Sequence, residues 1–166
     1  MSETAESDEA VATTSIRVAA PPAVAFRVFT EQIGGWWRRG THYWNDAARG
    51  LRLEFEPGVG GRLLEVYDDG AYEIGRVTAW EPAELLGFTW REASWEPEAF
   101  TTVDVRFDAD GDDATLVTVR HGGWDTAGHR DSLGGYSSGW VELLGWFGES
   151  AAQDGESAAR AGDAGA

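Results

Sequence analysis

Residues 51–121 alternate between apolar and polar side chains in six short segments, and this pattern restricts the fold more than any other feature of the chain. Side chains two positions apart on a β-strand point to the same side, so each segment predicts a strand with one apolar face. Mostly short turns join the segments, which favours an antiparallel meander. The predicted strands cover residues 51–56, 62–67, 72–80, 86–91, 103–107 and 117–121.

The segments on either side of this meander have other periods. TTSIRVAA at 13–20 predicts a further short strand, and PPAVAFRVFTEQIGG at 21–35 predicts a helix that its final glycine pair ends. Apolar residues then recur every three or four positions over 133–147, which predicts a longer helix. Glycines interrupt this helix, and we expect the space at Gly135 and Gly139 to let a strand or a bound molecule approach its backbone.

A length of 166 residues suits one domain with short tails. Residues 1–10 are acidic, and residues 151–166 are small, polar and acidic. Such segments bury too little apolar surface to fold alone, so we expect both to be disordered tails. The predicted folded domain therefore covers residues 11–150.

The chain has a formal net charge of −16 and contains neither cysteine nor lysine. An acidic surface repels phosphate backbones and anionic lipids, so we expect neither nucleic acid nor a membrane as partner. The absence of cysteine excludes disulfides and thiolate metal sites. The N-terminal residues lack the apolar stretch of a secretory signal, and no run of 18 apolar residues predicts a membrane span, so we expect a cytoplasmic protein.

Five stretches, taken in their order along the chain, form a recognisable set. They are AFRVFTEQIGGWW at 25–37, EPGVGGRLLEV at 56–66, GRVTAWEP at 75–82, LLGFTW at 85–90 and VTVRHGGW at 117–124. In these stretches the chain resembles the START-like or SRPBCC superfamily, and within it the branch named after the activator of Hsp90 ATPase homologue 1.

The resemblance implies an α+β helix-grip fold. A curved antiparallel sheet of six to seven strands would wrap around a long C-terminal helix, with two short helices after the first strand. It also implies a cavity between sheet and helix that binds lipids, hormones, polyketides or other apolar molecules. Some members of the superfamily are cyclases or dehydratases.

The stretch GGWWRRGTHYW at 34–44 places several aromatic rings after the first helix. Trp36 or Trp37 is expected either to fill the core or to face the cavity, since buried aromatic rings are ordinary core residues. Tyr43 and Trp44 lie in a segment without periodicity, and we expect them to line the cavity mouth.

Four further aromatic residues are predicted to face the cavity. Phe88 and Trp90 lie on the apolar face of one strand, and Tyr136 and Trp140 lie on the apolar stripe of the last helix. The same pattern also fits a solid core, so the sequence leaves open whether the cavity is open or filled. His121 shares a strand face with Val117 and is predicted to point inward, either as a satisfied core histidine or as a polar contact for a ligand.

Other candidate chemistry is weak. His121, Asp125 and His129 lie close in sequence without the helical spacing of a metal site, so no metal is predicted. No cofactor motif is present. By strand parity Glu65 lies opposite Leu64 and Val66, and we expect it on the outer face. Glu73 is ambiguous, with the outward position favoured because an unpaired buried charge is costly.

Three functions follow from these observations. The first is a carrier or sensor that binds a hydrophobic or aromatic small molecule through Trp36, Trp44, Phe88, Trp90, His121, Tyr136 and Trp140. The second is a cyclase or dehydratase in the same cavity, with His121 or Tyr136 as the acid–base group. The third is a chaperone-related interaction domain with an exposed apolar patch at 36–44, and a protein partner or homodimer stays open. The absence of a catalytic motif favours the first.

Overall fold

A computed structural model describes residues 10–164, with side chains described as far as residue 158. The predicted N-terminal tail therefore lies outside the described residues except for Ala10. Seven antiparallel strands form one sheet in the order β1–β7–β6–β5–β4–β3–β2. They are β1 (Ala12–Val18), β2 (Arg52–Phe55), β3 (Arg62–Tyr67), β4 (Gly70–Glu81), β5 (Leu85–Trp90), β6 (Thr101–Ala109) and β7 (Thr115–Gly122). The helices are α2 (Pro22–Thr30), α3 (Ile33–Trp36), α4 (Trp124–Ala127), the 3₁₀ turn η1 (Arg130–Ser132) and α5 (Leu133–Ala164).

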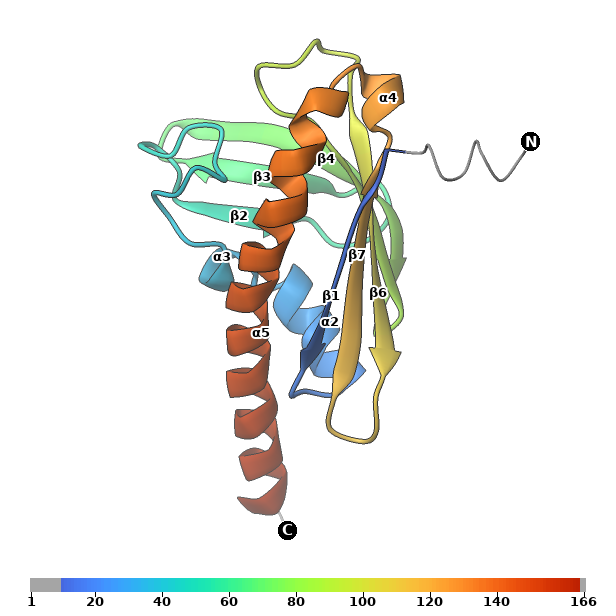
Figure 1. The fold of residues 1–166 in the computed structure, drawn as a ribbon. Coiled ribbons are helices and arrows are strands. Elements are labelled where there is room, and N and C mark those ends of the chain that lie inside the picture. The colour runs from blue at the N-terminus through green and yellow to red at the C-terminus, as the bar shows by residue number, and fades with distance from the viewer. Residues whose placement is uncertain (1–9, 165–166) are drawn as a thin grey trace, which may run out of the picture.

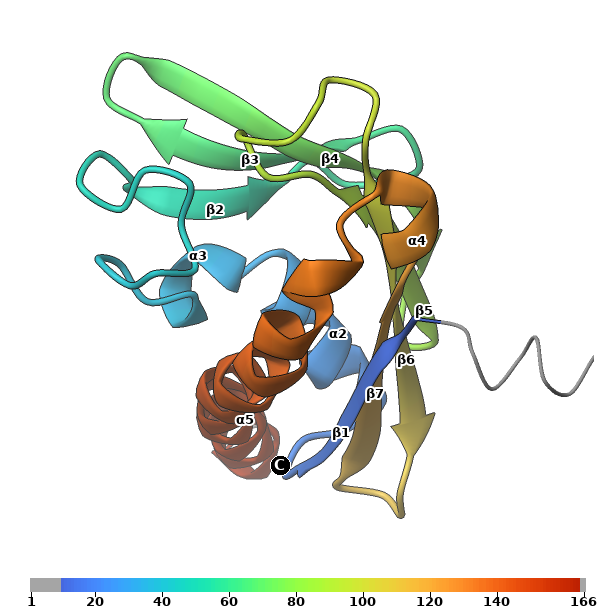
Figure 2. The ribbon, with the colours of Figure 1, turned by 45° about the horizontal axis from the view of Figure 1, so that its top comes forward.

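The sheet curves around α5, as the side view of Figure 1 and the tilted view of Figure 2 together show. Helix α5 packs against β1 and α2, and the short helices α2 and α3 fill the space between β1 and β2. This is the predicted helix-grip fold, with seven strands and two short helices after the first strand.

Alternation along the strands produces the core as the sequence predicts. On β6, Val103, Val105 and Phe107 are buried while the residues between them are exposed. Phe107 then contacts Phe29 of α2 with ring centroids 6.1 Å apart, and Phe29 contacts Phe147 of α5 at 5.1 Å. These rings fill the space beneath the middle of α5.

A β-bulge in β4 interrupts the alternation. Leu63 of β3 pairs with Gly75 and Leu64 pairs with Glu73, so Ile74 is the extra residue. Both Ile74 and Gly75 are buried as a result. A Cβ at Gly75 would lie 1.8 Å from the Thr89 carbonyl oxygen, so a residue with a side chain does not fit there. Bulges bend and twist a sheet, which helps this one to curve around α5.

Two predicted boundaries differ from the structure. Helix α2 ends at Thr30, and the glycine pair expected to stop it lies inside α3. The tail expected to be disordered from residue 151 instead continues α5 to Ala164. Ala151 is fully buried, and a Cβ at Gly155 would lie 2.6 Å from the Ala19 carbonyl oxygen. The helix therefore gains stability by packing on the chain after β1, which its composition does not reveal.

Candidate functional site

A cavity of about 370 Å³ lies between the first turns of α5, the loop from α3 to β2, and the end of β5. The loop covers residues 37–51. Three buried tryptophans form the inner wall, and exposed polar residues form the rim. The lining residues are Trp37, His42, Tyr43, Trp44, Asn45, Trp90, Glu92, Asp131, Ser132, Gly135, Tyr136, Gly139 and Leu143.

The inner wall consists of Trp37, Trp44 and Trp90, each at most 7% exposed. The ring centroids of Trp37 and Trp90 are 5.9 Å apart. The indole N–H of Trp44 donates to the Arg38 carbonyl at 2.7 Å, which ties the ring to the start of the loop. In contrast, the buried N–H of Trp37 has no hydrogen-bond partner in the part of the chain that the structure describes.

Two glycines shape the side of the cavity formed by α5. A Cβ at Gly139 would lie 3.0 Å from a ring carbon of Tyr43, so this ring packs directly on the helix backbone. A Cβ at Gly135 would meet nothing within 4 Å, because it would project into the open part of the cavity. These positions fit the expectation that glycines let other groups approach the helix.

A chain of hydrogen bonds joins β5 to α5 at the cavity. The indole N–H of Trp90 donates to the Tyr136 hydroxyl at 2.7 Å, and this hydroxyl donates to Glu92 Oε2 at 2.5 Å. Burial, and then the Glu92 carboxylate, raise the pKa of Tyr136 far above its ordinary value. The phenol therefore keeps its proton, which it donates to Glu92.

His121 is a satisfied core residue. It is fully buried, Trp140 Nε1 donates to its Nδ1 at 3.0 Å, and its Nε2 lies 2.7 Å from the Thr101 hydroxyl oxygen. The Thr101 hydroxyl donates in turn to the Trp90 carbonyl, so Nε2 carries the proton and donates to Thr101. Burial lowers the pKa of His121 to about 3, which keeps the ring neutral.

The structure brings together only part of the predicted site. Trp44, Trp90 and Tyr136 line the cavity, as does Tyr43. The other four predicted residues, Trp36, Phe88, His121 and Trp140, are not part of the lining.

Each of these four has a place in the packed interior. Trp36 donates its N–H to the Val28 carbonyl at 3.0 Å. Phe88 packs edge to face on Phe55 with centroids 5.3 Å apart. Trp140 donates to His121 from the buried side of α5. The interior is therefore filled beneath most of α5 and open at one end.

Sequence reasoning missed several lining residues. Trp37 lies in the aromatic stretch at 34–44, which is not a strand. Strand parity therefore does not indicate whether Trp36 or Trp37 faces the cavity. Glu92, Asp131 and Ser132 lie outside the regular strands and the apolar stripe, so no periodicity signalled them. Only their approach in space makes them part of one site.

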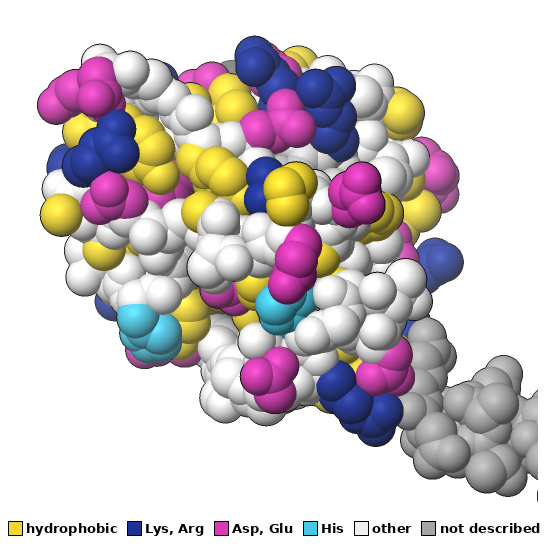
Figure 3. Space-filling view, turned by 90° about the horizontal axis from the view of Figure 1, so that it is seen from above, with side chains coloured by type: hydrophobic (Ala, Val, Ile, Leu, Met, Phe, Trp, Pro, Cys, Tyr) yellow, Lys and Arg dark blue, Asp and Glu magenta, His cyan; other side chains and the backbone are white. Residues whose placement is uncertain are grey.

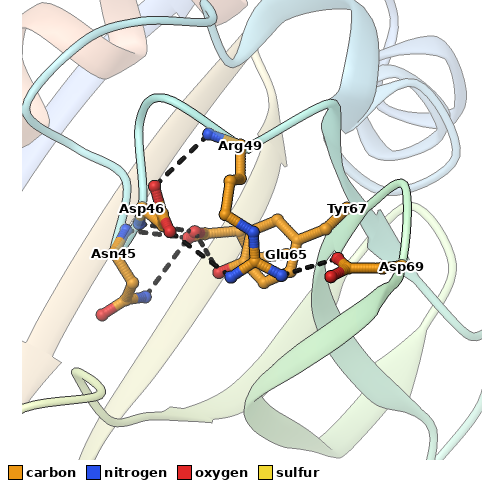
Figure 4. A network of polar contacts seen from close by, with 6 residues as sticks. All are labelled: Asn45, Asp46, Arg49, Glu65, Tyr67 and Asp69. Carbon is orange, nitrogen blue, oxygen red and sulfur yellow. Dashed lines mark hydrogen bonds and ion pairs between the residues drawn. The ribbon is translucent and has the colours of Figure 1, made fainter.

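Glu65 holds the cavity loop in place and is not on the outer face as expected. Its side chain is fully buried. The carboxylate accepts hydrogen bonds from the backbone N–H groups of Asn45 and Asp46, both at 2.9 Å, and from the Tyr67 hydroxyl at 2.6 Å (Figure 4). Arg49 lies 4.3 Å over the Tyr67 ring and bonds Asp69 at 2.6 Å on the exposed side.

Asn45 connects Glu65 to the segment that follows β5. Its side-chain N–H donates to Glu65 at 3.2 Å, and its Oδ1 accepts from the Ala93 N–H at 2.8 Å. The loop is thus tied both to β3 and to the segment that follows β5. Glu73, whose side was ambiguous, is exposed and bonds Arg76 at 3.1 Å.

The described residues contain neither a cluster of metal ligands nor a helix able to span a membrane. Among them, no three histidines, cysteines or acidic residues are grouped as a metal site requires. None of the helices within the described range combines the length and apolar character needed to cross a membrane.

The curved sheet and the long helix in its grip define a helix-grip domain, and this one has a cavity at one end. The chain belongs to the family described as Activator of Hsp90 ATPase homolog 1-like protein, whose model matches residues 19–148. Comparison with curated proteins gave no match.

Solved structures share the fold at low sequence identity. A protein from Mesorhizobium loti has a TM-score of 0.61 and 22% identity, over 82% of this chain and 94% of its own. An HSP90 activator from Plasmodium falciparum has a TM-score of 0.52 and 19% identity, over 68% and 71%. The anthrahydroquino-γ-pyrone synthase Txn09 has a TM-score of 0.55 and 24% identity, over 84% and 95%. The same fold thus occurs in proteins with different activities.

Proposed function

We propose that this protein binds a hydrophobic or aromatic small molecule in the cavity beneath the start of α5, as a carrier or sensor. The observation that carries this proposal is the lining of the cavity by indole and phenol rings. Its volume of about 370 Å³ falls within the roughly 300–1,000 Å³ typical of ligand sites. Flat aromatic walls favour a flat ligand of two or three rings.

Apolar burial supplies the driving force. A ligand that buries about 200 Å² of apolar surface gains roughly 5 kcal/mol at about 25 cal/mol per Å². Ordering of the binding site lowers this gain, but Glu65 and Asn45 already hold the loop before binding. A gain of roughly 5 kcal/mol corresponds to a dissociation constant of about 0.2 mM, so we expect dissociation constants of roughly 0.1–1 mM for simple aromatic probes.

The polar groups favour binding over catalysis. His121 is neutral, has both ring nitrogens in hydrogen bonds, and is not among the lining residues. The raised pKa of Tyr136 keeps its phenol protonated and makes it a weak acid, so it suits neither role in acid–base catalysis. An exposed interaction patch at 36–44 is disfavoured too, because Trp36, Trp37 and Trp44 are buried. On the face that Figure 3 shows, hydrophobic side chains lie in separate groups between polar and charged ones.

A matched pair of glycine variants tests the proposal. Gly135→Phe places a ring in the cavity, whereas Gly134→Phe adds the same ring at a neighbouring exposed position outside the lining. Binding of a naphthalene probe is followed by quenching of tryptophan fluorescence, supported by calorimetry. We expect the wild type and Gly134→Phe to bind and Gly135→Phe to lose at least tenfold in affinity. Equal affinity in all three proteins would contradict binding in this cavity.

A further inference from the structure

In the described part of the chain, the carboxylates that line the cavity have no cationic side chain beside them in the lining, and one histidine, His42, lies at the rim. Glu92 and Asp131 belong to the lining, and no arginine does within the described residues. Glu92 uses Oε2 to accept from Tyr136, while no described residue bonds its Oε1. His42 is exposed and lies against Tyr43, with ring centroids 4.0 Å apart and the ring planes tilted by 40°. The cavity therefore offers carboxylate oxygens to a bound molecule.

The arginines closest in sequence to the lining residues are engaged elsewhere. Arg38 bonds Glu149 at 3.2 Å, and Arg39 donates to the Gly50 carbonyl at 3.0 Å. Arg91 lies over the Tyr72 ring at 5.5 Å, and Arg130 bonds Asp125 at 3.1 Å. A carboxylate or phosphate on a ligand would thus meet like charge without a cation to neutralise it.

The aromatic lining adds to this selectivity. Rings of Trp37, Tyr43, Trp44, Trp90 and Tyr136 surround the same space. Ammonium groups are attracted to the faces of such rings, tryptophan above all, and the attraction grows when water is excluded. Aromatic rings together with carboxylates are the combination that recognises organic cations.

We propose that the cavity selects apolar ligands that carry a positively charged amine over ligands of the same shape that carry a carboxylate. This inference rests on the proposed function, since it names the chemical class of the ligand. The amine would lie near Glu92 at the inner rim, with the apolar body against the tryptophans. The protein would therefore discriminate against fatty acids and other anionic lipids.

Three naphthalene probes of similar size test this selectivity: 2-(1-naphthyl)ethylamine, 2-(1-naphthyl)ethanol and 1-naphthylacetic acid. Dissociation constants are measured by calorimetry at pH 8. We expect the amine to bind at least tenfold more tightly than the acid, with the alcohol between them. Glu92→Gln keeps an acceptor for Tyr136 and should reduce the amine-to-acid ratio at least threefold.

Asp112→Asn is the control variant, because it removes the same charge from the exposed β6–β7 turn. It should leave the ratio within twofold of the wild type. Equal or tighter binding of the acid, or an equal effect of Asp112→Asn and Glu92→Gln, would overturn the inference while leaving the proposed function intact. Binding of none of the three probes would contradict both.

Discussion

Trp36 and Trp37 are adjacent buried tryptophans whose indole N–H groups differ in hydrogen bonding. The N–H of Trp36 donates to the Val28 carbonyl at 3.0 Å near the end of α2. The Gln32 N–H, which would bond this carbonyl in a longer helix, bonds the Arg27 carbonyl instead. The N–H of Trp37 has no partner in the described part of the chain. Replacing each by phenylalanine therefore separates the hydrogen bond from the packing.

Both substitutions remove the same atoms from buried positions, so their packing costs are similar. Trp36→Phe also leaves the Val28 carbonyl without its partner, at a cost of about 1–3 kcal/mol. Trp37→Phe removes an unpaired donor and should recover a similar free energy. We expect Trp36→Phe to be less stable than Trp37→Phe by about 2 kcal/mol or more. At this chain length the difference corresponds to about 4–8 °C in Tm.

Urea denaturation monitored by far-UV circular dichroism measures the two free energies of unfolding, and thermal scans measure the two Tm values. Equal m-values for both variants would show that the midpoints can be compared directly. A Trp37→Phe protein as unstable as Trp36→Phe, or less stable, would refute the reasoning. That result would mean that packing, rather than the paired or unpaired N–H, decides the stability at this site.

Three further predictions concern other buried groups. Glu65→Gln replaces one acceptor oxygen by a donor that faces backbone N–H groups. The free energy of unfolding, measured by urea denaturation, should fall by about 2–4 kcal/mol, and hydrogen exchange at the Asn45 amide should become faster. His121 has a folded pKa of about 3, below its unfolded value, so the unfolded state binds the proton first as pH falls. Stability should then decrease by up to about 1.4 kcal/mol per pH unit from about pH 6 toward pH 3, and a His121→Gln variant with the same slope would contradict this. Gly155→Ala should destabilise the protein because its Cβ would clash with the Ala19 carbonyl. Gly145→Ala has open space around its Cβ and should stabilise the protein by about 0.5–1 kcal/mol. A higher Tm for Gly155→Ala than for Gly145→Ala would contradict this account of how α5 packs.

The alternating strands and the apolar helix stripe were predictable because both patterns are local. Val103, Val105 and Phe107 are buried as parity requires, and so are Val117 and Val119. Parity failed where the chain departs from a regular strand. The bulge at Ile74 changes which side chains face inward, which is why the sequence left Glu73 ambiguous.

Glu65 shows a second limit of pattern reasoning. An acidic residue in a strand predicts an exposed side chain because a buried charge is costly without partners. Here the partners are N–H groups at Asn45 and Asp46 and the Tyr67 hydroxyl, and the two N–H groups come from a loop about twenty residues away. The cost of burial is offset only after that loop has folded over β3.

The sequence by itself determined the order of strands and helices, the apolar face of most strands and the resemblance to the family. These properties depend on periods of two or about 3.6 residues, which neighbouring side chains define. Only the tertiary structure decided which rings face open space. Trp44, Trp90 and Tyr136 come from a loop, a strand and a helix, and they meet because the sheet curves and α5 crosses it. A cavity depends on distances between such segments, and no local pattern contains those distances.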